Sequence, residues 1–171
     1  MSTARIAFIA TITLACGLLG RRYLAEPVYI ASASMEPTLT VGHHLFVDKI
    51  TYRFRKPGRQ EIICFESPVG EAHDSIKRVI AVEGDTVGLK EKKVYLNGEP
   101  QLEIYTRYTR AGETLEGDNL GPLKVPPDSF FVLGDNRDNS NDSATWKDPA
   151  TGERFYFIKL ERVRGKVRGI Y

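Results

Sequence analysis

The chain has 171 residues, which is enough for one ordinary domain and a short extra segment but not for two large domains. Its 24 Lys and Arg residues against 22 Asp and Glu residues leave a net charge of only +2 with no basic stripe, which argues against nucleic-acid binding. The two cysteines, Cys16 and Cys64, are too few for a disulfide framework or a cysteine-based metal site.

The first apolar segment, Ile6–Gly20, carries no charge and lies between Arg5 and Arg21-Arg22. Its length, about 15 residues, is short for a bilayer span, which needs roughly 17–25 residues, but flanking arginines can snorkel to the interface. A cleaved secretory signal and a lipoprotein signal ending at Cys16 are the alternatives, although no small-x-small cleavage site follows. We therefore expect a retained anchor over residues 1–24. The flanking charges balance and predict no orientation.

From residue 25 onward the sequence predicts a β-rich domain, because short runs of Val, Ile, Tyr and Phe alternate with turn signals. Asn97-Gly98 is a hairpin signal, since both residues tolerate positive φ. The polar stretch Tyr105–Lys124 lacks alternation, and we expect it to leave the core as an extended excursion. The predicted strands are Val28–Ser32, His44–Ile50, Gln60–Phe65, Ile76–Glu83, Thr86–Leu89, Lys93–Leu96, Ser129–Leu133, Phe155–Ile158 and Gly165–Ile170. Strands so closely spaced imply antiparallel sheets forming a sandwich or barrel.

Two short basic clusters, Tyr52–Arg59 and Arg162–Arg168, interrupt this pattern. Apolar residues flank both, so a solvated face is the simpler interpretation. Contact with anionic lipid head groups is the alternative.

The segment Ser32–Leu39 reads SASMEPTL and directly follows a predicted strand. Pro37 stops the strand from continuing, so Ser34 is expected at a bend with its hydroxyl available. An ordinary Ser/Pro turn is the alternative interpretation.

Lys77 lies in the apolar strand Ile76–Glu83. A lone lysine on a strand usually points to solvent. A lysine that acts as a base must instead be deprotonated near neutral pH, which requires desolvation to lower its pKa from about 10.4 by several units. The apolar neighbours of Lys77 suit that shift.

The segment Gly134–Ser143 reads GDNRDNSNDS and follows the apolar strand Phe130–Leu133. A simple loop and a calcium loop are the alternatives, but the EF-hand spacing is absent, because no Gly stands at the sixth position and no Glu closes the loop. Its dense donors and acceptors could instead orient a catalytic lysine.

Together, in this order, these segments closely resemble the bacterial type I signal peptidase family, whose members use a Ser-Lys dyad. The resemblance covers the whole chain. The patterns SxSMxPTL at Ser32–Leu39 and GDNRDNSxDS at Gly134–Ser143 are highly specific, whereas Lys77-Arg78 and Gly84-Asp85 match a looser box. The sequence departs from the usual residues at four positions: Ala31 replaces Pro, Ala81 replaces Gly, Glu83 replaces Pro or Gly, and Ala144 replaces Arg. The last departure removes an expected partner of the acidic loop around Asp142.

The resemblance implies a mainly β fold: a barrel-like antiparallel catalytic core over residues 25–171, with a small extended β insertion at about 97–126, preceded by one transmembrane helix. It further implies a membrane-bound serine endopeptidase that removes signal peptides from exported preproteins and cleaves after small residues. The expected location is the plasma membrane, crossed once, with the catalytic domain on the extracytoplasmic side in contact with membrane lipid. A monomer with no metal, no cofactor and no nucleic acid is expected.

Residue roles follow from the same resemblance. Ser34 is the expected nucleophile and Lys77 the general base, because a serine hydroxyl needs a base to take its proton. The backbone N–H of Ser34 and the hydroxyl of Ser32 match the oxyanion donors. Ser140 matches the residue that hydrogen-bonds the lysine, and Asp142 supports that loop. Four apolar residues match the walls of shallow substrate pockets, although each could equally be plain core: Ile30, Met35, Leu39 and Ile76.

Other interpretations make distinct predictions. A histidine-dependent mechanism would have to use His43, His44 or His73, but no GxSxG elbow accompanies them. A maturation protease of the conjugation or organelle type would share the Ser-Lys chemistry and differ in substrate. A catalytically silent β domain tethered to the membrane would work without Ser34 and Lys77.

Overall fold

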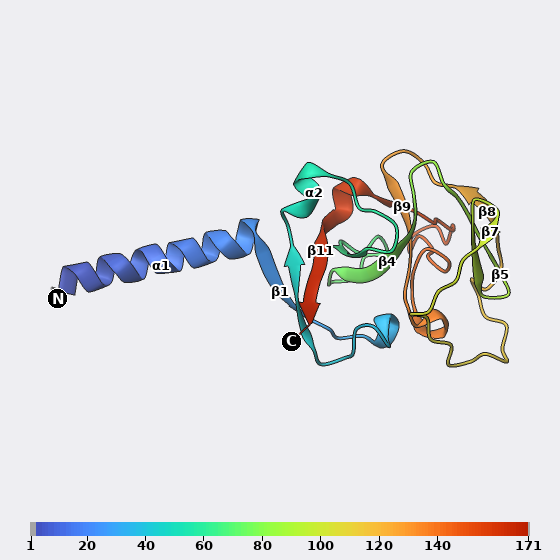
Figure 1. Cartoon of the computed structure of the whole chain (residues 1–171), viewed down its shortest axis with the longest axis horizontal. Helices are drawn as coiled ribbons and strands as arrows, with labels where there is room; N and C mark the ends of the chain where they lie inside the picture. Colours follow the sequence, from blue (N-terminus) through green and yellow to red (C-terminus); the bar gives the residue numbers. More distant parts are fainter. Residues whose placement is uncertain (1–2, 171) are drawn as a thin grey trace.

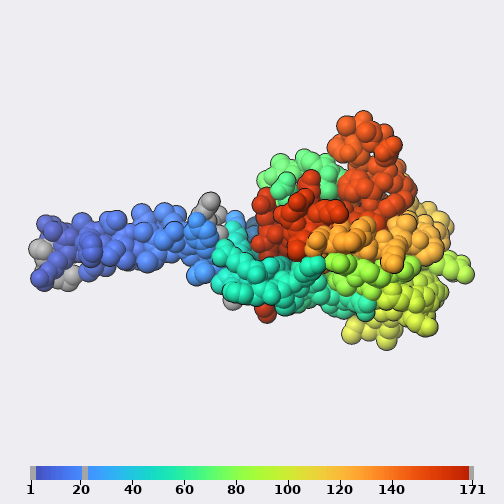
Figure 2. Space-filling view, turned by 90° about the horizontal axis from the view of Figure 1, so that it is seen from above, coloured from blue at the N-terminus to red at the C-terminus, as the bar shows by residue number. Residues whose placement is uncertain are grey.

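The computed structural model describes residues 3–170 and consists of one projecting helix and a body of two β-sheets (Figure 1). Helix α1 (Thr3–Tyr23) stands clear of the body in both views (Figure 2). Its stretch Thr3–Gly20 is long and apolar enough to cross a membrane, and none of it is buried against the protein. The helix extends beyond the predicted Ile6–Gly20 at both ends, which supplies the length that the apolar run alone lacks.

The larger sheet, sheet A, is a curled antiparallel sheet that forms most of the body. In spatial order its strands are β1 (Ala25–Tyr29), β2 (His44–Asp48), β11 (Val163–Ile170), β3 (Ile62–Phe65), β4 (Ser75–Val82), β9 (Ser129–Leu133) and β10 (Ile158–Lys159). Strands β4 and β9 lie inside the sheet and are covered on both faces, which explains why they are continuous apolar runs rather than alternating ones. This mainly antiparallel β architecture with one N-terminal apolar helix confirms the predicted fold class.

Sheet B is a smaller antiparallel sheet at the end of the body opposite α1 (Figure 1). Its strands, in spatial order, are β7 (Glu99–Pro100), β6 (Lys93–Leu96), β5 (Thr86–Lys90) and β8 (Leu120–Lys124). The predicted hairpin joins β6 to β7, with Asn97 at φ 54° and Gly98 at φ 89°. Two of its strands, β5 and β6, precede the predicted insertion at 97–126.

Short helical turns connect the strands: η1 (Ala33–Met35), α2 (Thr51–Phe54), η2 (Arg137–Asn139) and η3 (Leu160–Arg162). Helix α2 begins where the Asp48 carboxylate accepts hydrogen bonds from the N–H groups of Ile50 and Thr51, at 2.8 and 3.0 Å. Those bonds satisfy two of the donors that a helix start leaves without partners.

Three apolar clusters form the core. The first fills the space between the sheets, the second covers the other face of β4 and β9, and the third lies under η1 and β2. Their most buried members are, respectively, Ala81, Val87, Val94 and Phe131; Ile63, Phe65, Val79 and Val132; and Leu39, Leu45 and Val47. The third cluster lies directly behind the segment that carries Ser34.

Two strand predictions and one loop prediction need correction. The first strand runs over Ala25–Tyr29 rather than Val28–Ser32, because the chain leaves β1 to enter η1. Of the predicted strand Phe155–Ile158 only Ile158 lies in a strand, β10, which runs over Ile158–Lys159. The expected excursion Tyr105–Lys124 is wrong at its end, since Leu120–Lys124 forms strand β8 and pairs with β5. Backbone pairing with a neighbouring strand and packing of Leu120 and Leu123 on the core stabilise β8 although the strand contains Gly121 and Pro122, which are unfavourable in strands.

Candidate active site

Ser34 and Lys77, which are 43 residues apart in the chain, meet in the structure. The Lys77 Nζ donates a hydrogen bond of 2.9 Å to the Ser34 Oγ. Both side chains are buried, with exposed fractions of 7% for Ser34 and 5% for Lys77. A serine hydroxyl within hydrogen-bond reach of an amine is the arrangement that nucleophilic catalysis by a Ser-Lys pair requires.

The Ser34 segment is held by hydrogen bonds from the third polar segment. The Asn136 N–H donates to the carbonyl oxygen of Ser34 at 3.0 Å, and the Asn136 Nδ2 donates to the carbonyl oxygen of Ala33 at 3.1 Å. On its other side, Met35 packs in the third core cluster at 2% exposure. These contacts hold the backbone on both sides of Ser34 and so position its hydroxyl.

Lys77 is presented by β4, where it faces Ile63 of β3 across the sheet. Burial lowers the pKa of its ammonium group below the ordinary value, and the carboxylates of Asp142, Glu71 and Asp135 act in the opposite direction. Within residues 3–170 Lys77 forms no ion pair; its second hydrogen bond, of 3.2 Å, goes to the carbonyl oxygen of Ile76. Desolvation without a contacting carboxylate favours the neutral amine.

The two groups predicted from the sequence as oxyanion donors lie beside the Ser34 hydroxyl. The Ser32 Oγ is 3.1 Å from the Ser34 Oγ. The Ser34 N–H belongs to the first turn of η1, where N–H groups have no acceptor inside the helix. Both predicted oxyanion donors thus lie next to the Ser34 hydroxyl, while their role stays a prediction.

Asp142 and Ser140 lie behind Ser34 and Lys77. The Asp142 carboxylate is buried and accepts hydrogen bonds from the N–H groups of Gly134 at 2.9 Å and Ala144 at 3.1 Å. Burial raises its pKa, and the Gly134 N–H and the nearby Ser140 hydroxyl oppose that shift. The predicted hydrogen bond from Ser140 to Lys77 is not formed: the Ser140 Oγ is buried and has no hydrogen-bond partner of standard geometry among residues 3–170.

Gly134 separates Ser140 from the nucleophile. A Cβ atom at position 134 would overlap the Ser140 hydroxyl on one side and the carbonyl oxygen of Ser34 on the other. Only glycine allows this approach of the two catalytic segments.

A buried ion pair next to Lys77 was missing from the predicted site. Arg78 binds Asp135 in a bidentate manner, with Nε–Oδ1 and Nη2–Oδ2 distances of 2.9 and 2.6 Å. Its guanidinium also stacks on the ring of Tyr105, 4.0 Å from the centroid. Arg78 directly follows Lys77, and Asp135 lies in the segment Gly134–Ser143, five residues before Ser140; their place in these two segments was the sequence signal for them.

The chain between β7 and β8 forms two more ion pairs near the Arg78–Asp135 pair. Glu103 forms a buried bidentate pair with Arg137, and Arg107 forms an ion pair of 2.7 Å with Glu36, two residues after Ser34. The segment between β7 and β8 therefore contacts both the segment Ser32–Leu39 and the segment Gly134–Ser143.

The four candidate pocket residues lie together in the third core cluster. Ile30, Met35 and Leu39 are almost completely buried, and Ile76 is partly buried against them. The structure brings them beside Ser34, while their role as pocket walls stays a prediction.

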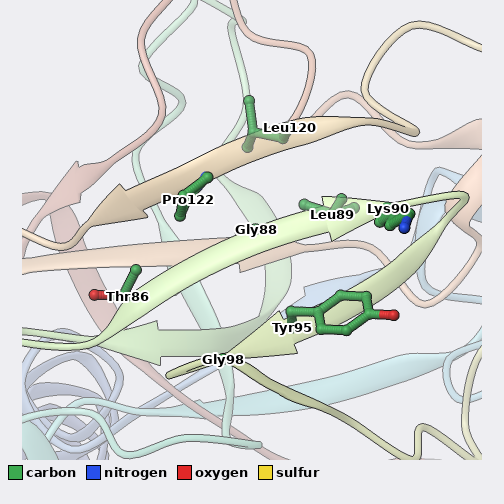
Figure 3. Close-up of a pocket in the computed structure, with 8 residues that line it drawn as sticks. All are labelled: Thr86, Gly88, Leu89, Lys90, Tyr95, Gly98, Leu120 and Pro122. Atoms are coloured by element: carbon green, nitrogen blue, oxygen red, sulfur yellow. The ribbon is translucent and has the colours of Figure 1, made fainter.

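A larger hollow lies elsewhere, on sheet B. Its volume is about 200 Å³, and Figure 3 shows Thr86, Tyr95, Leu120 and Pro122 around the bare backbone of Gly88. A narrow cavity of about 20 Å³ lies beside Ser140 and Asp142 and is far smaller. Neither hollow contains Ser34 or Lys77.

The four departures from the family pattern have clear positions. Ala31 is exposed, and Ala81 is fully buried in the core between the sheets. Glu83 lies on the surface, where its carboxylate accepts hydrogen bonds from Lys56 at 2.9 Å and from the Asp128 N–H at 3.1 Å. Ala144 is buried at 6% exposure, and in residues 3–170 Asp142 has backbone N–H partners rather than an ion pair.

No histidine takes part in the hydrogen bonds given above for Ser34 and Lys77. The ring of His44 packs on Tyr29 at a centroid distance of 5.4 Å. A search of residues 3–170 found no group of three or more His, Cys, Asp or Glu side chains arranged to hold a metal ion.

A family model described as signal peptidase, peptidase S26, matches residues 2–171. A probable signal peptidase I-2 from Synechocystis is 42% identical over 143 residues, which cover 81% of this chain and 62% of that protein. A signal peptidase I P from Bacillus subtilis subsp. natto is 36% identical over 163 residues, covering 90% of this chain and 87% of that protein. The chain thus matches less than two thirds of the length of the Synechocystis relative.

One solved structure is similar in fold. It is a crystal structure of a signal peptidase I from Enterococcus faecalis, with 30% sequence identity and a TM-score of 0.50. The match covers 67% of this chain and 98% of that one.

Proposed function

The chain belongs to the signal peptidase family, peptidase S26, and from this premise we propose that it is a membrane-bound serine endopeptidase that removes N-terminal signal peptides from exported preproteins. The observation that carries the proposal is the contact between the buried Lys77 amine and the Ser34 hydroxyl, at 2.9 Å. Sequence similarity identifies the family, and this contact supports the proposed mechanism, in which Lys77 takes the proton of the Ser34 hydroxyl.

In the proposed reaction the Ser34 Oγ attacks the carbonyl carbon of the scissile peptide bond while the neutral Lys77 Nζ takes the hydroxyl proton. The tetrahedral intermediate then collapses: the C–N bond breaks, Lys77 returns the proton to the leaving amine, and an acyl group stays on Ser34. Lys77 next takes a proton from water, whose oxygen attacks the ester. The acid product leaves and Ser34 recovers its proton.

The negative charge that develops on the carbonyl oxygen needs donors that are already in place. We propose the Ser34 N–H and the Ser32 hydroxyl for this role. The 3.1 Å distance between the Ser32 and Ser34 hydroxyls supports it, because an oxygen bonded to the attacked carbon lies within reach of both groups.

Ser140 and Asp142 are proposed as positioning residues for Lys77. Asp142 orients the loop through its bonds to Gly134 and Ala144, and it attracts the ammonium form of Lys77. Ser140 lies next to Asp142 with its hydroxyl buried and available for a hydrogen bond. A rotation of this hydroxyl toward Lys77 during the reaction would orient the amine.

The substrate is proposed to bind as an added β-strand, so that its backbone provides much of the affinity. Strand β1 is an edge of sheet A and leads directly into the Ser34 segment, which supports this mode. Ile30, Met35, Leu39 and Ile76 would line shallow apolar pockets that exclude large side chains and therefore select small residues before the cleavage site.

The proposed location is the plasma membrane, which helix α1 crosses once. We propose that the β domain, as a monomer in contact with membrane lipid, lies on the extracytoplasmic side, where signal peptides emerge. Protease treatment of intact spheroplasts tests this orientation: digestion of the β domain supports it, and full protection until the cells are lysed contradicts it.

The central experiment incubates the detergent-solubilised full chain with a purified preprotein and follows the size of the product. The wild type is expected to produce mature protein with a new N-terminus after a small residue, and the Ser34→Ala variant is expected to produce none. An uncut preprotein with the wild type contradicts the proposed function. Cutting only a pilin-type or organelle-type precursor would assign a maturation protease instead, and an unchanged biological role for Ser34→Ala would indicate a silent binding domain.

A further inference from the structure

Sheet B contributes a partly buried cation, Lys92, to the loop that carries Ser140 and Asp142. Lys92 lies in the turn between β5 and β6, and its Nζ is 2.6 Å from the Asp138 Oδ1 of η2. The contact joins positions 46 residues apart in the chain and links the smaller sheet to the loop beside the Ser-Lys pair.

Asp138 is buried, and Lys92 is partly buried against it. The Asp138 side chain is 0% exposed and the Lys92 side chain 12% exposed. The second carboxylate oxygen of Asp138 accepts the Arg110 N–H at 2.6 Å, and the Lys92 Nζ also donates to the Arg110 carbonyl oxygen at 2.9 Å. These hydrogen bonds stabilise the charged form of Asp138 and lower its pKa, against the effect of its desolvation.

The pair connects directly to the proposed catalytic loop. Asp138 stands two residues before Ser140 and four before Asp142. Lys92, Ser140 and Asp142 also line the same cavity of about 20 Å³, a volume suited to one water molecule and too small for a ligand. The two sheets therefore meet in one packed unit at this loop.

We propose that Lys92 is a positioning residue for the peptidase reaction: from sheet B it fixes η2, and through η2 it fixes Ser140 and Asp142 behind Lys77. This inference rests on the proposed function. Without the cation, the buried Asp138 carboxylate would keep its backbone N–H donors but lose its ion-pair partner, which is unfavourable. Outward movement of η2 relieves that cost and carries Ser140 and Asp142 away from Lys77.

The test compares Lys92→Met with Lys93→Met, since Lys93 is the adjacent lysine and is exposed. Both full-length variants are assayed for kcat and KM on one preprotein, with the folded fraction measured by circular dichroism. Lys92→Met is expected to lower kcat per folded molecule by about 10- to 100-fold, because small displacements of positioning groups have effects of this size. Its KM should stay within about twofold, since substrate contacts are unchanged. Lys93→Met should match the wild type in both.

The conservative variant Lys92→Arg keeps the charge and is expected to recover most of the lost kcat. If Lys92→Met does not fold, Lys92→Gln provides the same comparison, because it removes the charge that pairs with Asp138 while keeping a polar side chain of similar length. A kcat that equals that of Lys93→Met, or a loss confined to KM, overturns the proposal while the wild-type activity upholds the proposed function. Absence of wild-type cleavage overturns the proposed function itself.

Discussion

Lys77 and Arg78 are neighbours in β4, are both buried, and have opposite surroundings. Lys77 contacts a hydroxyl and a carbonyl oxygen, and desolvation lowers its pKa. Arg78 binds both oxygens of Asp135, donates to the Gln60 carbonyl oxygen at 3.0 Å and stacks on Tyr105. Alternation along a strand places the two side chains on different faces.

The difference shows how one strand presents a reactive amine and a fixed charge side by side. A lysine without a carboxylate contact can lose its proton when it is buried. An arginine cannot be deprotonated in proteins, so it is buried with its counter-ion. The Lys77 face is suited to proton transfer and the Arg78 face to holding the polar segments around it.

The strongest test of this comparison gives Lys77 the properties of Arg78. Lys77→Arg keeps the length and charge of the side chain but removes its ability to act as a base, and Lys77→Met removes the amine. Both are expected to lower kcat on a preprotein by at least about 10³-fold, as loss of a member of a catalytic unit does. The double variant Ser34→Ala/Lys77→Met should be no worse than either single variant. Substantial cleavage by Lys77→Arg would contradict the assigned roles.

The converse change tests the Arg78 face. Arg78→Met leaves Asp135 buried without its cation and is expected to lower the free energy of unfolding by about 3–5 kcal/mol. Urea unfolding of the detergent-solubilised protein measures this effect. Asp135→Asn introduced into Arg78→Met should restore part of the loss, because the uncompensated charge is gone. A loss below about 1 kcal/mol would mean that the pair contributes no more than a surface ion pair.

Gly134 lies between Ser140 and the carbonyl oxygen of Ser34, where the two polar segments of the site come close together. Gly134→Ala is expected to destabilise the protein by about 1–3 kcal/mol through overpacking and to lower kcat, since the added methyl group displaces Ser140 or the Ser34 carbonyl. Gly121→Ala in β8 is the matched control, because no atom lies within 4 Å of the position that its Cβ would take. Equal behaviour of the two variants would show that the close approach at Gly134 is unimportant.

The smallest expected effect concerns the charges that act on Lys77. Asp142, Glu71 and Asp135 favour its ammonium form, so removal of one negative charge lowers the Lys77 pKa further. The base must be neutral, and the acidic limb of the kcat/KM profile follows this pKa. Glu71→Gln keeps the polar contacts of Glu71 with Ser75 and Asn141, and it should move the acidic limb to lower pH. Glu66→Gln is the control and should leave the profile unchanged. A shift to higher pH contradicts the electrostatic account.

Most of the site could be predicted from sequence because its key residues lie in short, specific segments. Ser34 is marked by the following Met35 and Pro37, and Lys77 by its apolar strand. The hairpin at Asn97-Gly98 was predictable for a similar reason, since it depends on the φ values of two adjacent residues.

The remaining features depend on contacts between distant residues. Strand β8 forms because β5 offers a pairing edge, which the short segment Leu120–Lys124, with its Gly121 and Pro122, does not reveal. The Arg78–Asp135 and Lys92–Asp138 pairs join positions 57 and 46 residues apart. The direction of the Ser140 hydroxyl depends on how η2 packs, so the family pattern identified the residue but not its contact.

The central claim is that Lys77 is a neutral amine positioned to deprotonate Ser34. It is tested most directly by NMR titration of the protein carrying ¹³C-labelled lysine side chains, with the Lys77 signal assigned from its loss in Lys77→Arg. The account predicts a Lys77 pKa below the ordinary value of 10.5 that coincides with the acidic limb of kcat/KM. A Lys77 signal that stays in the ammonium form up to pH 10.5 or above while the enzyme is active at neutral pH would contradict it.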